Sequence, residues 1–347
     1  MSGHDEESKI SECSIDINWR EKEKESRPSK RVIEAREKKH QRRMEREVNI
    51  ALSTDSSYLI PTVVAVKSIL MHAHEDNIYN IYILTDTPLS DEQSAMIKMG
   101  AQGHPNASIS IRAVGDMLQD VRLCEDGPVK GVTRATYFRF LLPDLINADR
   151  VLYMDCDTLV LRDVAEIYRQ DIGDNYLAGV RDITGHDNVT ARLDELHLPT
   201  LDNYVNAGVL LMNLSLMRRD GIAEKMLICA SHRSYSYNDQ DIINVTCYEK
   251  IHKLSPRYNI IVDFIDQADL VSELLSTDYS AEAEEAVILH YAGRSKPWYY
   301  DSNHPWACHW WRVADSLREE SLAFGLQFSL FLVRSLNRRR KDFRSRT

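Results

Sequence analysis

Short apolar runs alternate with helix-patterned segments along the first part of the chain. The runs at 48–52, 78–84 and 107–111 predict three strands. An apolar helical face follows Pro61, and Ser90 opens a second helix. This alternation is typical of an α/β fold with a single, mostly parallel sheet flanked by helices. Ligands bind at the carboxyl ends of the strands in such sheets.

Two aspartates stand at predicted strand ends. Asp55 follows the first strand and Asp86 follows the second. Either side chain could contact a ligand, or serve only in a turn or a helix cap.

A further buried strand, residues 151–154, ends at Asp155-Cys156-Asp157. Two carboxylates at positions i and i+2 can converge on one ion if the chain turns there. Their oxygens suit Mg²⁺ or Mn²⁺ and leave coordination positions free for phosphate oxygens. The alternative is a pair of solvated loop carboxylates.

An Asp-x-Asp pair after a strand also occurs in haloacid-dehalogenase-like phosphatases, where the pattern is D-x-D-x-T. Here the threonine, Thr158, comes one position too early, and Leu159 takes its place. In those phosphatases the strand is commonly near the start of the fold, whereas here it lies about a hundred residues into the folded body. Both differences count against a phosphatase.

A second group of chemically active residues, 290–298, follows the apolar run 286–289. It contains a candidate metal ligand in His290, a flexible Gly293, and a cation, Lys296, that can pair with phosphate. A lone histidine after a strand is usually structural, but the presence of Gly293, Lys296 and Trp298 in the same segment favours a functional site.

Two polar segments lie between these groups. Asn206-Ala207-Gly208 precedes an expected strand at 209–212, and is predicted either to bind sugar hydroxyls or to form a turn. Asp239-Gln240-Asp241 precedes an expected helix at 242–248, so one aspartate could be its N-cap. Carboxylates and amides also bind vicinal sugar hydroxyls.

Charge and cysteine usage limit the class of protein. The net charge is -10, although the segments 19–47 and 330–347 are basic, so nucleic acid is not an expected partner. The six cysteines are scattered, as in reduced intracellular proteins. With no apolar segment at the N-terminus and no run of 18 apolar residues, we expect a cytoplasmic protein.

The two ends differ from the body. Residues 1–47 form a charged extension, expected to be helical or disordered. Residues 301–347 form an aromatic and basic tail, in which the apolar segment 324–333 precedes Arg338-Arg339-Arg340-Lys341. Such a tail could lie on an anionic membrane, or pack on the domain as a C-terminal helix.

The ordered motifs together resemble glycosyltransferase family 8, which includes bacterial lipopolysaccharide α-galactosyl- and α-glucosyltransferases and, more distantly, glycogenin. The resemblance covers roughly residues 48–300. It rests on six segments: Ser53-Thr54-Asp55, Thr136-Tyr137-Phe138-Arg139, Tyr153 through Asp157, Asn206-Ala207-Gly208, Asp239-Gln240-Asp241, and His290 through Trp298, which matches H-x-x-G-x-x-K-P-W. One departure is Ser56-Ser57, where the family often has an acidic or amide residue.

The resemblance implies a GT-A type fold over 48–300, a UDP-hexose donor, and Mn²⁺ (or Mg²⁺) held by Asp155, Asp157 and His290. It implies that Gly293 and Lys296 meet the diphosphate, and that Asp55 and Tyr58 lie by the uracil and ribose. Gln240 and Asp239 would be the catalytic pair. The remaining donor-binding residues it implies are Ser53, Arg139, Cys156, Asn206 and Ala207.

The function predicted from the sequence is therefore a retaining hexosyltransferase. It would move glucose or galactose to a saccharide or lipid-linked saccharide, such as lipopolysaccharide or another cell-surface glycan. We expect it in the cytoplasm, either free or held on the inner face of the membrane by its tail. The alternatives are a glycogenin-like protein that glucosylates its own tyrosine and a non-enzymatic sugar-nucleotide-binding or scaffold protein.

Overall fold

The computed structural model describes residues 45–344 apart from 125–127, 129–131, 184, 294, 300, 301, 303 and 305, with side chains as far as Val333. Residues 1–44 lie outside the described residues. The predicted N-terminal extension, with Cys13, and the side chains of Arg338 to Lys341 are therefore not described. The other five cysteines are free thiols.

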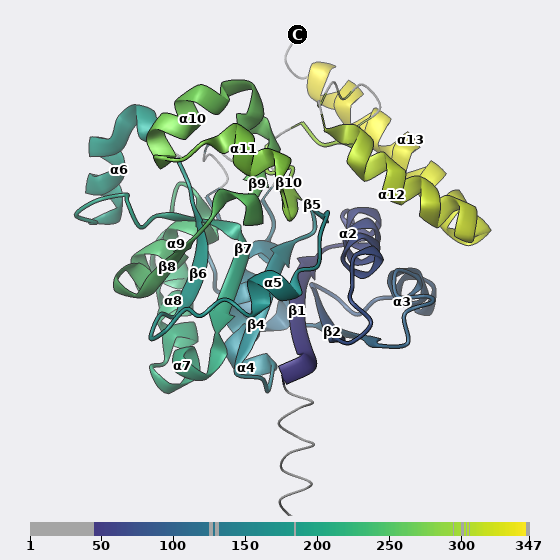
Figure 1. Ribbon diagram of the computed structural model, residues 1–347, viewed down its shortest axis with the longest axis horizontal. Coiled ribbons are helices and arrows are strands. Elements are labelled where there is room, and N and C mark those ends of the chain that lie inside the picture. The colour runs from purple at the N-terminus through teal and green to yellow at the C-terminus, as the bar shows by residue number, and fades with distance from the viewer. Residues whose placement is uncertain are drawn as a thin grey trace, which may run out of the picture. The chain divides into compact units, whose positions relative to one another are not determined.

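The centre of the fold is a seven-stranded sheet (Figure 1). Its spatial order is β3-β2-β1-β4-β7-β6-β8. Only β7 runs antiparallel to its neighbours, β4 and β6, which confirms the predicted mostly parallel sheet. The strands are β1 (Glu47–Thr54), β2 (Ile78–Thr85), β3 (Ala107–Ala113), β4 (Arg150–Asp155), β6 (Leu177–Arg181), β7 (Val205–Asn213) and β8 (Ile251–Leu254).

Helices cover both faces of this sheet, because successive side chains of a strand point to opposite faces. Leu152 and Met154 of β4 pack in one core cluster with α2, whereas Val151 and Tyr153 pack in a second cluster with α9. The α-helices are α2 (Leu59–Met71), α3 (Asp91–Met99), α4 (Leu142–Leu145), α5 (Ala165–Tyr168), α6 (Val189–Leu196), α7 (Leu214–Arg219), α8 (Ile222–His232), α9 (Asn238–Cys247), α10 (Ala268–Leu275), α11 (Tyr279–Glu284), α12 (Ala307–Glu320) and α13 (Leu322–Arg344). Short 3-10 helices are η1 (Gly115–Leu118), η2 (Arg134–Leu141), η3 (His186–Asn188), η4 (Tyr248–Lys250), η5 (Pro256–Tyr258) and η6 (Val262–Gln267).

The predicted helix starts near Pro61 and Ser90 are both present. Pro61 lies in the first turn of α2. Ser90 caps α3 in a capping box, accepting from the N–H of Gln93 while its own N–H donates to the Gln93 side chain.

A second, three-stranded sheet was not predicted. It consists of β5 (Thr158–Val160), β10 (Ile288–His290) and β9 (Ile260–Ile261), in the order β5-β10-β9. Strands of two or three residues are too short to produce a periodic sequence pattern. The expected strand at 286–289 is in fact β10, and it includes His290.

Two predicted boundaries were wrong in ways that matter for the site. β7 begins at Val205 and not at residue 209, so Asn206, Ala207 and Gly208 lie within the strand and do not form a turn. α9 begins at Asn238 and not at residue 242, so Asp239, Gln240 and Asp241 lie in its first turn. Neither aspartate is the N-cap, a position taken by Tyr237 without a side-chain cap.

The C-terminal helices α12 and α13 pack on each other through aromatic side chains. Phe324 and Phe328 are buried with Trp310, and the ring of Phe328 also meets that of Trp311 edge-on. Lys67 of α2 pairs with Glu320 at the end of α12 at 2.8 Å. None of the described helices is long and apolar enough to cross a membrane.

Candidate active site

The two aspartates of the Asp-x-Asp pair lie at the carboxyl edge of the central sheet. Asp155 is the last residue of β4 and stands opposite Ser53 of β1, whose strand leads into Asp55. Because β7 runs antiparallel to β4, its first residues, including Asn206, come to the same edge.

The small second sheet brings His290 to these carboxylates. β5 starts one residue after Asp157, and β10 pairs with it so that His290 stands opposite Thr158. The N–H of Tyr291 also donates to the carbonyl of Asp157 at 3.0 Å. As a result, His290 Nε2 lies 3.4 Å from Asp157 Oδ1 and 3.9 Å from Asp155 Oδ2.

These three side chains fit a divalent cation. Their ligand atoms all lie within 4.8 Å of one another. With metal–oxygen bonds of about 2.1 Å, neighbouring octahedral ligands are about 3 Å apart and opposite ones about 4.2 Å. Two carboxylates and one imidazole also suit Mn²⁺ chemically.

The imidazole of His290 is held with one nitrogen free for a metal. Its Nδ1 lies 3.0 Å from Oδ1 of Asn259, an amide oxygen that can only accept, so Nδ1 carries the proton. Nε2, which faces the aspartates, is then the unprotonated nitrogen, as a metal ligand requires. Sequence reasoning missed Asn259, and no motif marked it.

The surroundings of Gly208 explain why the Asn-Ala-Gly segment has a glycine at this position. A Cβ at this position would lie 2.1 Å from Cε1 of His290 and 2.9 Å from Oδ2 of Asp155. The strand β7 can therefore pass directly beside the candidate metal ligands only without a side chain there.

Lys296 also contacts one of the two carboxylates, that of Asp157. Its Nζ lies 2.6 Å from Asp157 Oδ2 and donates to the carbonyl of Tyr291. Burial alone would raise the pKa of Asp157, but Lys296 and His290 outweigh it and hold that pKa well below its usual range. The site thus carries an ionised Asp157.

Arg139, in η2, joins the candidate metal ligands to α9. Its guanidinium lies 2.8 Å from Asp155 Oδ1 and 3.1 Å from Asp239 Oδ2, and the side chain is almost fully buried. Burial would lower the pKa of Arg139, but these carboxylates raise it above its ordinary value. Asp155 Oδ1 also accepts from Tyr153 at 2.8 Å.

Asp239 is a further carboxylate in the site, beside Arg139. Burial raises its pKa to about 6, against the opposing effects of Arg139 and a hydrogen bond from Thr136. Asp239 therefore changes charge near neutral pH, which is common at functional sites.

Gln240 is fixed in orientation by the ends of β6 and β7. Its Oε1 accepts from the N–H of Ala207 at 3.0 Å and from Asn206 at 3.2 Å. Its Nε2 donates to Asp182 at 3.1 Å, and Asp182 also accepts from Asn206 at 2.9 Å. Sequence reasoning missed Asp182, which directly follows β6 and carried no motif.

The predicted uracil and ribose residues lie next to this cluster. The two oxygens of Asp55 accept from Ser57 at 2.8 Å and from Thr133 at 3.0 Å, so this carboxylate takes part in a turn. The ring of Tyr58 meets that of Trp298 edge-on, with centroids 5.7 Å apart. Burial, followed by Asp157, raises the pKa of Tyr58.

Cys156 and Gly293, two further predicted donor-binding residues, make hydrogen bonds to neighbouring segments of the chain. The thiol of Cys156 is buried against Thr62 and the carbonyl of Ser53. The N–H of Gly293 donates to Asp263 at 3.1 Å.

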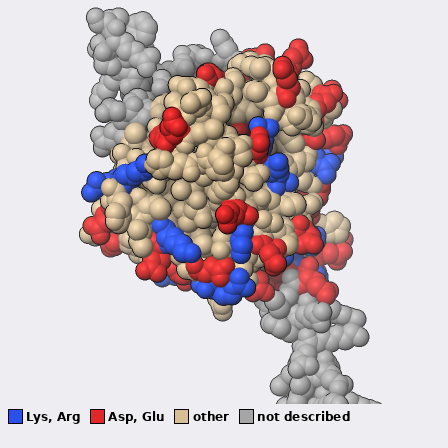
Figure 2. Space-filling model, turned by 90° about the vertical axis from the view of Figure 1, so that its left-hand side faces the viewer, with Lys and Arg blue, Asp and Glu red and all other residues tan. Residues whose placement is uncertain are grey.

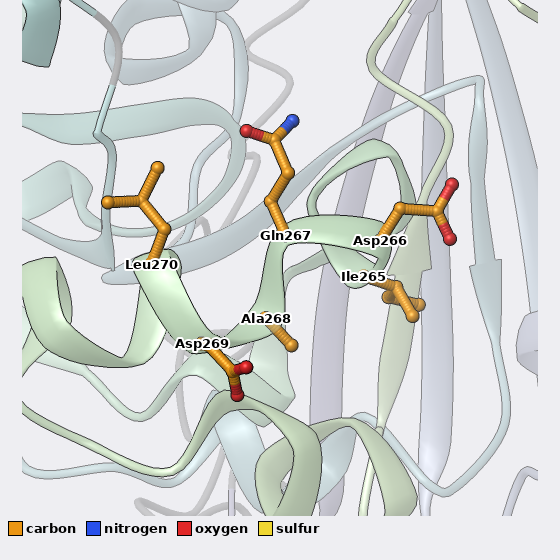
Figure 3. A pocket seen from close by; sticks show the side chains of 6 residues that line it. All are labelled: Ile265, Asp266, Gln267, Ala268, Asp269 and Leu270. Carbon is orange, nitrogen blue, oxygen red and sulfur yellow. The ribbon is translucent and has the colours of Figure 1, made fainter.

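Other surface features lie outside this cluster. A hollow of about 360 Å³ lies where η6 meets α10, lined by residues 265–270. Figure 3 shows the side chains that line it. On the face that carries α6 and α8, acidic and basic side chains are interspersed (Figure 2).

The sheet order and the side chains at its carboxyl edge define a glycosyltransferase of GT-A type fold. The structure matches that of the galactosyltransferase LgtC in complex with donor and acceptor sugar analogues, with a TM-score of 0.63 and 23% identity over 78% of this chain and 96% of that one. The family model for glycosyl transferase family 8 matches residues 49–302, and the chain belongs to that family.

The sequence also matches characterised relatives. It is 26% identical to lipopolysaccharide 1,3-galactosyltransferase of Salmonella typhimurium, over 75% of this chain and 74% of that protein. It is 31% identical to general stress protein A of Bacillus subtilis, over 50% of this chain and 63% of that protein. The chain thus spans less than two thirds of some relatives that it matches.

Proposed function

We propose that this enzyme is a retaining hexosyltransferase that moves glucose or galactose from a UDP-sugar to a saccharide acceptor, such as lipopolysaccharide or another cell-surface glycan. The support from relatives is a family resemblance to proteins named as galactosyl- and glucosyltransferases of lipopolysaccharide. The donor, the metal and the acceptor are parts of this proposal.

One observation carries the proposal. Asp155, Asp157 and His290 converge with their ligand atoms within 4.8 Å of one another, at the carboxyl edge of the sheet. The hydrogen bond from Nδ1 of His290 to Asn259 leaves Nε2 available in the same place. A Mn²⁺ or Mg²⁺ ion bound there would neutralise the donor's diphosphate and stabilise the charge that develops on it.

Lys296 is suited to binding the diphosphate. Its ammonium is adjacent to Asp157 and mostly buried, so it acts in a region of reduced dielectric where a charge pair is stronger than in water. A phosphate oxygen near Asp157 would meet a cation that is already in place, without the cost of ordering a free side chain.

Gln240 and Asp239 would bind the transferred sugar. The amide oxygen of Gln240 already accepts two hydrogen bonds, which makes it a poor nucleophile. We therefore favour attack of the acceptor hydroxyl on the anomeric carbon from the face that UDP leaves. The bond from that carbon to UDP breaks as the new one forms, and a phosphate oxygen takes the hydroxyl proton. A glycosyl-enzyme adduct on either residue would contradict this.

The experiment is a panel of UDP-sugars incubated with the enzyme, with Mn²⁺ and with EDTA, in which slow transfer to water is measured as UDP release. We expect release from UDP-glucose or UDP-galactose only with Mn²⁺. Release from none of the sugars, or equal release with EDTA, would contradict the proposal. Intact mass measured on the same samples tests the glycogenin-like alternative, since self-glucosylation adds hexose units to the protein.

The tail supports a second part of the proposal, peripheral attachment to an anionic membrane. One face of α13 packs on α12, but Leu322, Leu326, Leu330 and Val333 are exposed on the other face, between 51% and 81%. Spaced three or four residues apart, they form a continuous apolar stripe that ends before a basic segment. Such a helix can lie in a membrane surface without spanning it.

A further inference from the structure

Asp263, in η6, contacts the main chain of the segment between His290 and Lys296. The N–H of Gly293 donates to Asp263 Oδ2 at 3.1 Å. A Cβ on Gly293 would lie 2.2 Å from Oδ1 of Asp263, so the glycine lets the carboxylate lie directly against the main chain. The segment is thus attached at its middle to a side chain that the family motif does not include.

His304 approaches the same carboxylate oxygen as the N–H of Gly293. Its Nε2 is 3.9 Å from Asp263 Oδ2, within ion-pair reach but longer than a hydrogen bond. Its side chain is only 3% exposed, and neither ring nitrogen makes a hydrogen bond with the described residues. A buried imidazole without a closer partner is costly, so its position beside Asp263 calls for an explanation.

The direction of the pKa shift of Asp263 indicates that its carboxyl group is ionised where it accepts from the N–H of Gly293. Burial alone would raise the pKa, but His304 and the N–H of Gly293 outweigh that effect and lower it. Asp263 is therefore ionised at neutral pH, and its hydrogen bond with Gly293 is one to a charged group, which is stronger than a neutral one.

Tyr291 gives a second connection between this segment and the chain that leads into α12. Its hydroxyl donates to the carbonyl of Trp306 at 2.9 Å, and its ring meets that of His304 edge-on, with centroids 5.1 Å apart. The family match ends at residue 302, so both contacts come from residues beyond it.

We propose that Asp263 and His304 are positioning residues that hold the segment 291–296, so that His290 at one end and Lys296 at the other keep the spacing needed to bind the donor. The proposal rests on the proposed function for its effect on the donor. The attachment of the segment itself does not depend on that function.

The first test measures the attachment directly. Hydrogen exchange of peptides covering 291–296 is compared in the wild type, Asp263→Asn and His304→Leu. We expect exchange about tenfold faster in Asp263→Asn, in which the charged acceptor of the Gly293 N–H becomes a neutral amide. Exchange should also be faster in His304→Leu, which loses the ion-pair contact with Asp263. Asp266→Asn is the matched control, since Asp266 is on the same short helix but exposed at the hollow in Figure 3. Unchanged exchange in Asp263→Asn would overturn the proposal.

The second test separates positioning from simple structural support. His304→Gln keeps an N–H donor at the end of the side chain, and we expect it to restore most of what His304→Leu loses. In Asp263→Asn and His304→Leu, the KM for the donor should rise about tenfold while kcat changes by less. If His304→Gln and His304→Leu behave alike, or if kcat falls with KM unchanged, the positioning role is wrong.

The outcomes distinguish this inference from the proposed function. If wild-type protein does not bind UDP with Mn²⁺, the proposed function fails, whatever the exchange data show. If the wild type binds UDP with Mn²⁺ and Asp263→Asn binds it equally well, only the positioning role fails. Thermal unfolding of each variant shows whether it is folded, and the His304→Gln and His304→Leu pair remains informative if Asp263→Asn is not.

Discussion

His290 and Asn259 are joined by a hydrogen bond of 3.0 Å between Nδ1 and Oδ1, on the side of the imidazole away from the two aspartates. Asn259 in turn donates to Asn206 at 3.0 Å, so the ring is tied to the start of β7. The orientation of the candidate metal ligand is thus set by two buried amides.

Replacing Asn259 by Leu should weaken metal binding by about 10- to 100-fold, since this is the usual effect of removing a partner that orients a histidine ligand. Calorimetric titration with Mn²⁺ in the presence of UDP measures it. Asn80→Leu is a matched control, because Asn80 lies near the start of β2, at the opposite edge of the sheet. Equal Mn²⁺ affinity in Asn259→Leu and the wild type would show that Asn259 does not orient the ring.

Gly208→Ala should abolish metal-dependent UDP binding, because the added methyl group would occupy space 2.1 Å from Cε1 of His290. Gly325→Ala in α13 is the control, since a Cβ there meets nothing within 4 Å. That substitution should stabilise the helix by about 0.5–1 kcal/mol. Tight UDP binding by Gly208→Ala with Mn²⁺ would mean that His290 is not a ligand.

Asp239 should make stability depend on pH. Its folded-state pKa of about 6 lies above its ordinary value, so the folded state holds the proton more tightly than the unfolded state. The contribution of this carboxyl is then most favourable below about pH 4, and is lost as pH rises through about 6. Over that interval the free energy of unfolding should fall by about 2–3 kcal/mol relative to Asp239→Asn. Urea unfolding of both proteins, without added metal, measures the difference. If the free energies of unfolding of the two proteins changed with pH in parallel, the raised pKa of Asp239 would be contradicted.

Membrane attachment should depend on the exposed stripe of α13. Deletion of the helix is a poor test, because Phe324 and Phe328 are buried and their loss would expose the core. Leu326→Glu with Leu330→Glu should instead reduce binding to vesicles containing phosphatidylglycerol by at least tenfold. Leu270→Glu, at a 39% exposed position in α10, is the control. If the double variant bound the vesicles as well as the wild type does, the proposed membrane attachment through α13 would be wrong.

The sequence predicted the parts of the fold that depend on local patterns. The buried run ending at Asp155 and the alternation around Pro61 and Ser90 gave the sheet, its helices and the edge where the site lies. The resemblance predicted that His290 would meet Asp155 and Asp157, and the structure does bring these three side chains together.

What the sequence could not predict depends on contacts between distant segments. β5 and β10 have three residues each, so their pairing, which brings His290 into place, has no periodic pattern. Asn259 and Asp182 act through hydrogen bonds to residues more than twenty positions away. Gly208 resembled a turn because its close approach to His290 exists only in three dimensions.

The central claim is that Asp155, Asp157 and His290 hold one divalent ion that binds the donor's diphosphate. Calorimetric titration of UDP into the wild type and Asp157→Asn, with Mn²⁺ and with EDTA, tests it most directly. The account predicts that the wild type takes up UDP with Mn²⁺ only, and that Asp157→Asn, although folded, takes up little in either condition. Equal UDP affinity of the wild type with Mn²⁺ and with EDTA would contradict it.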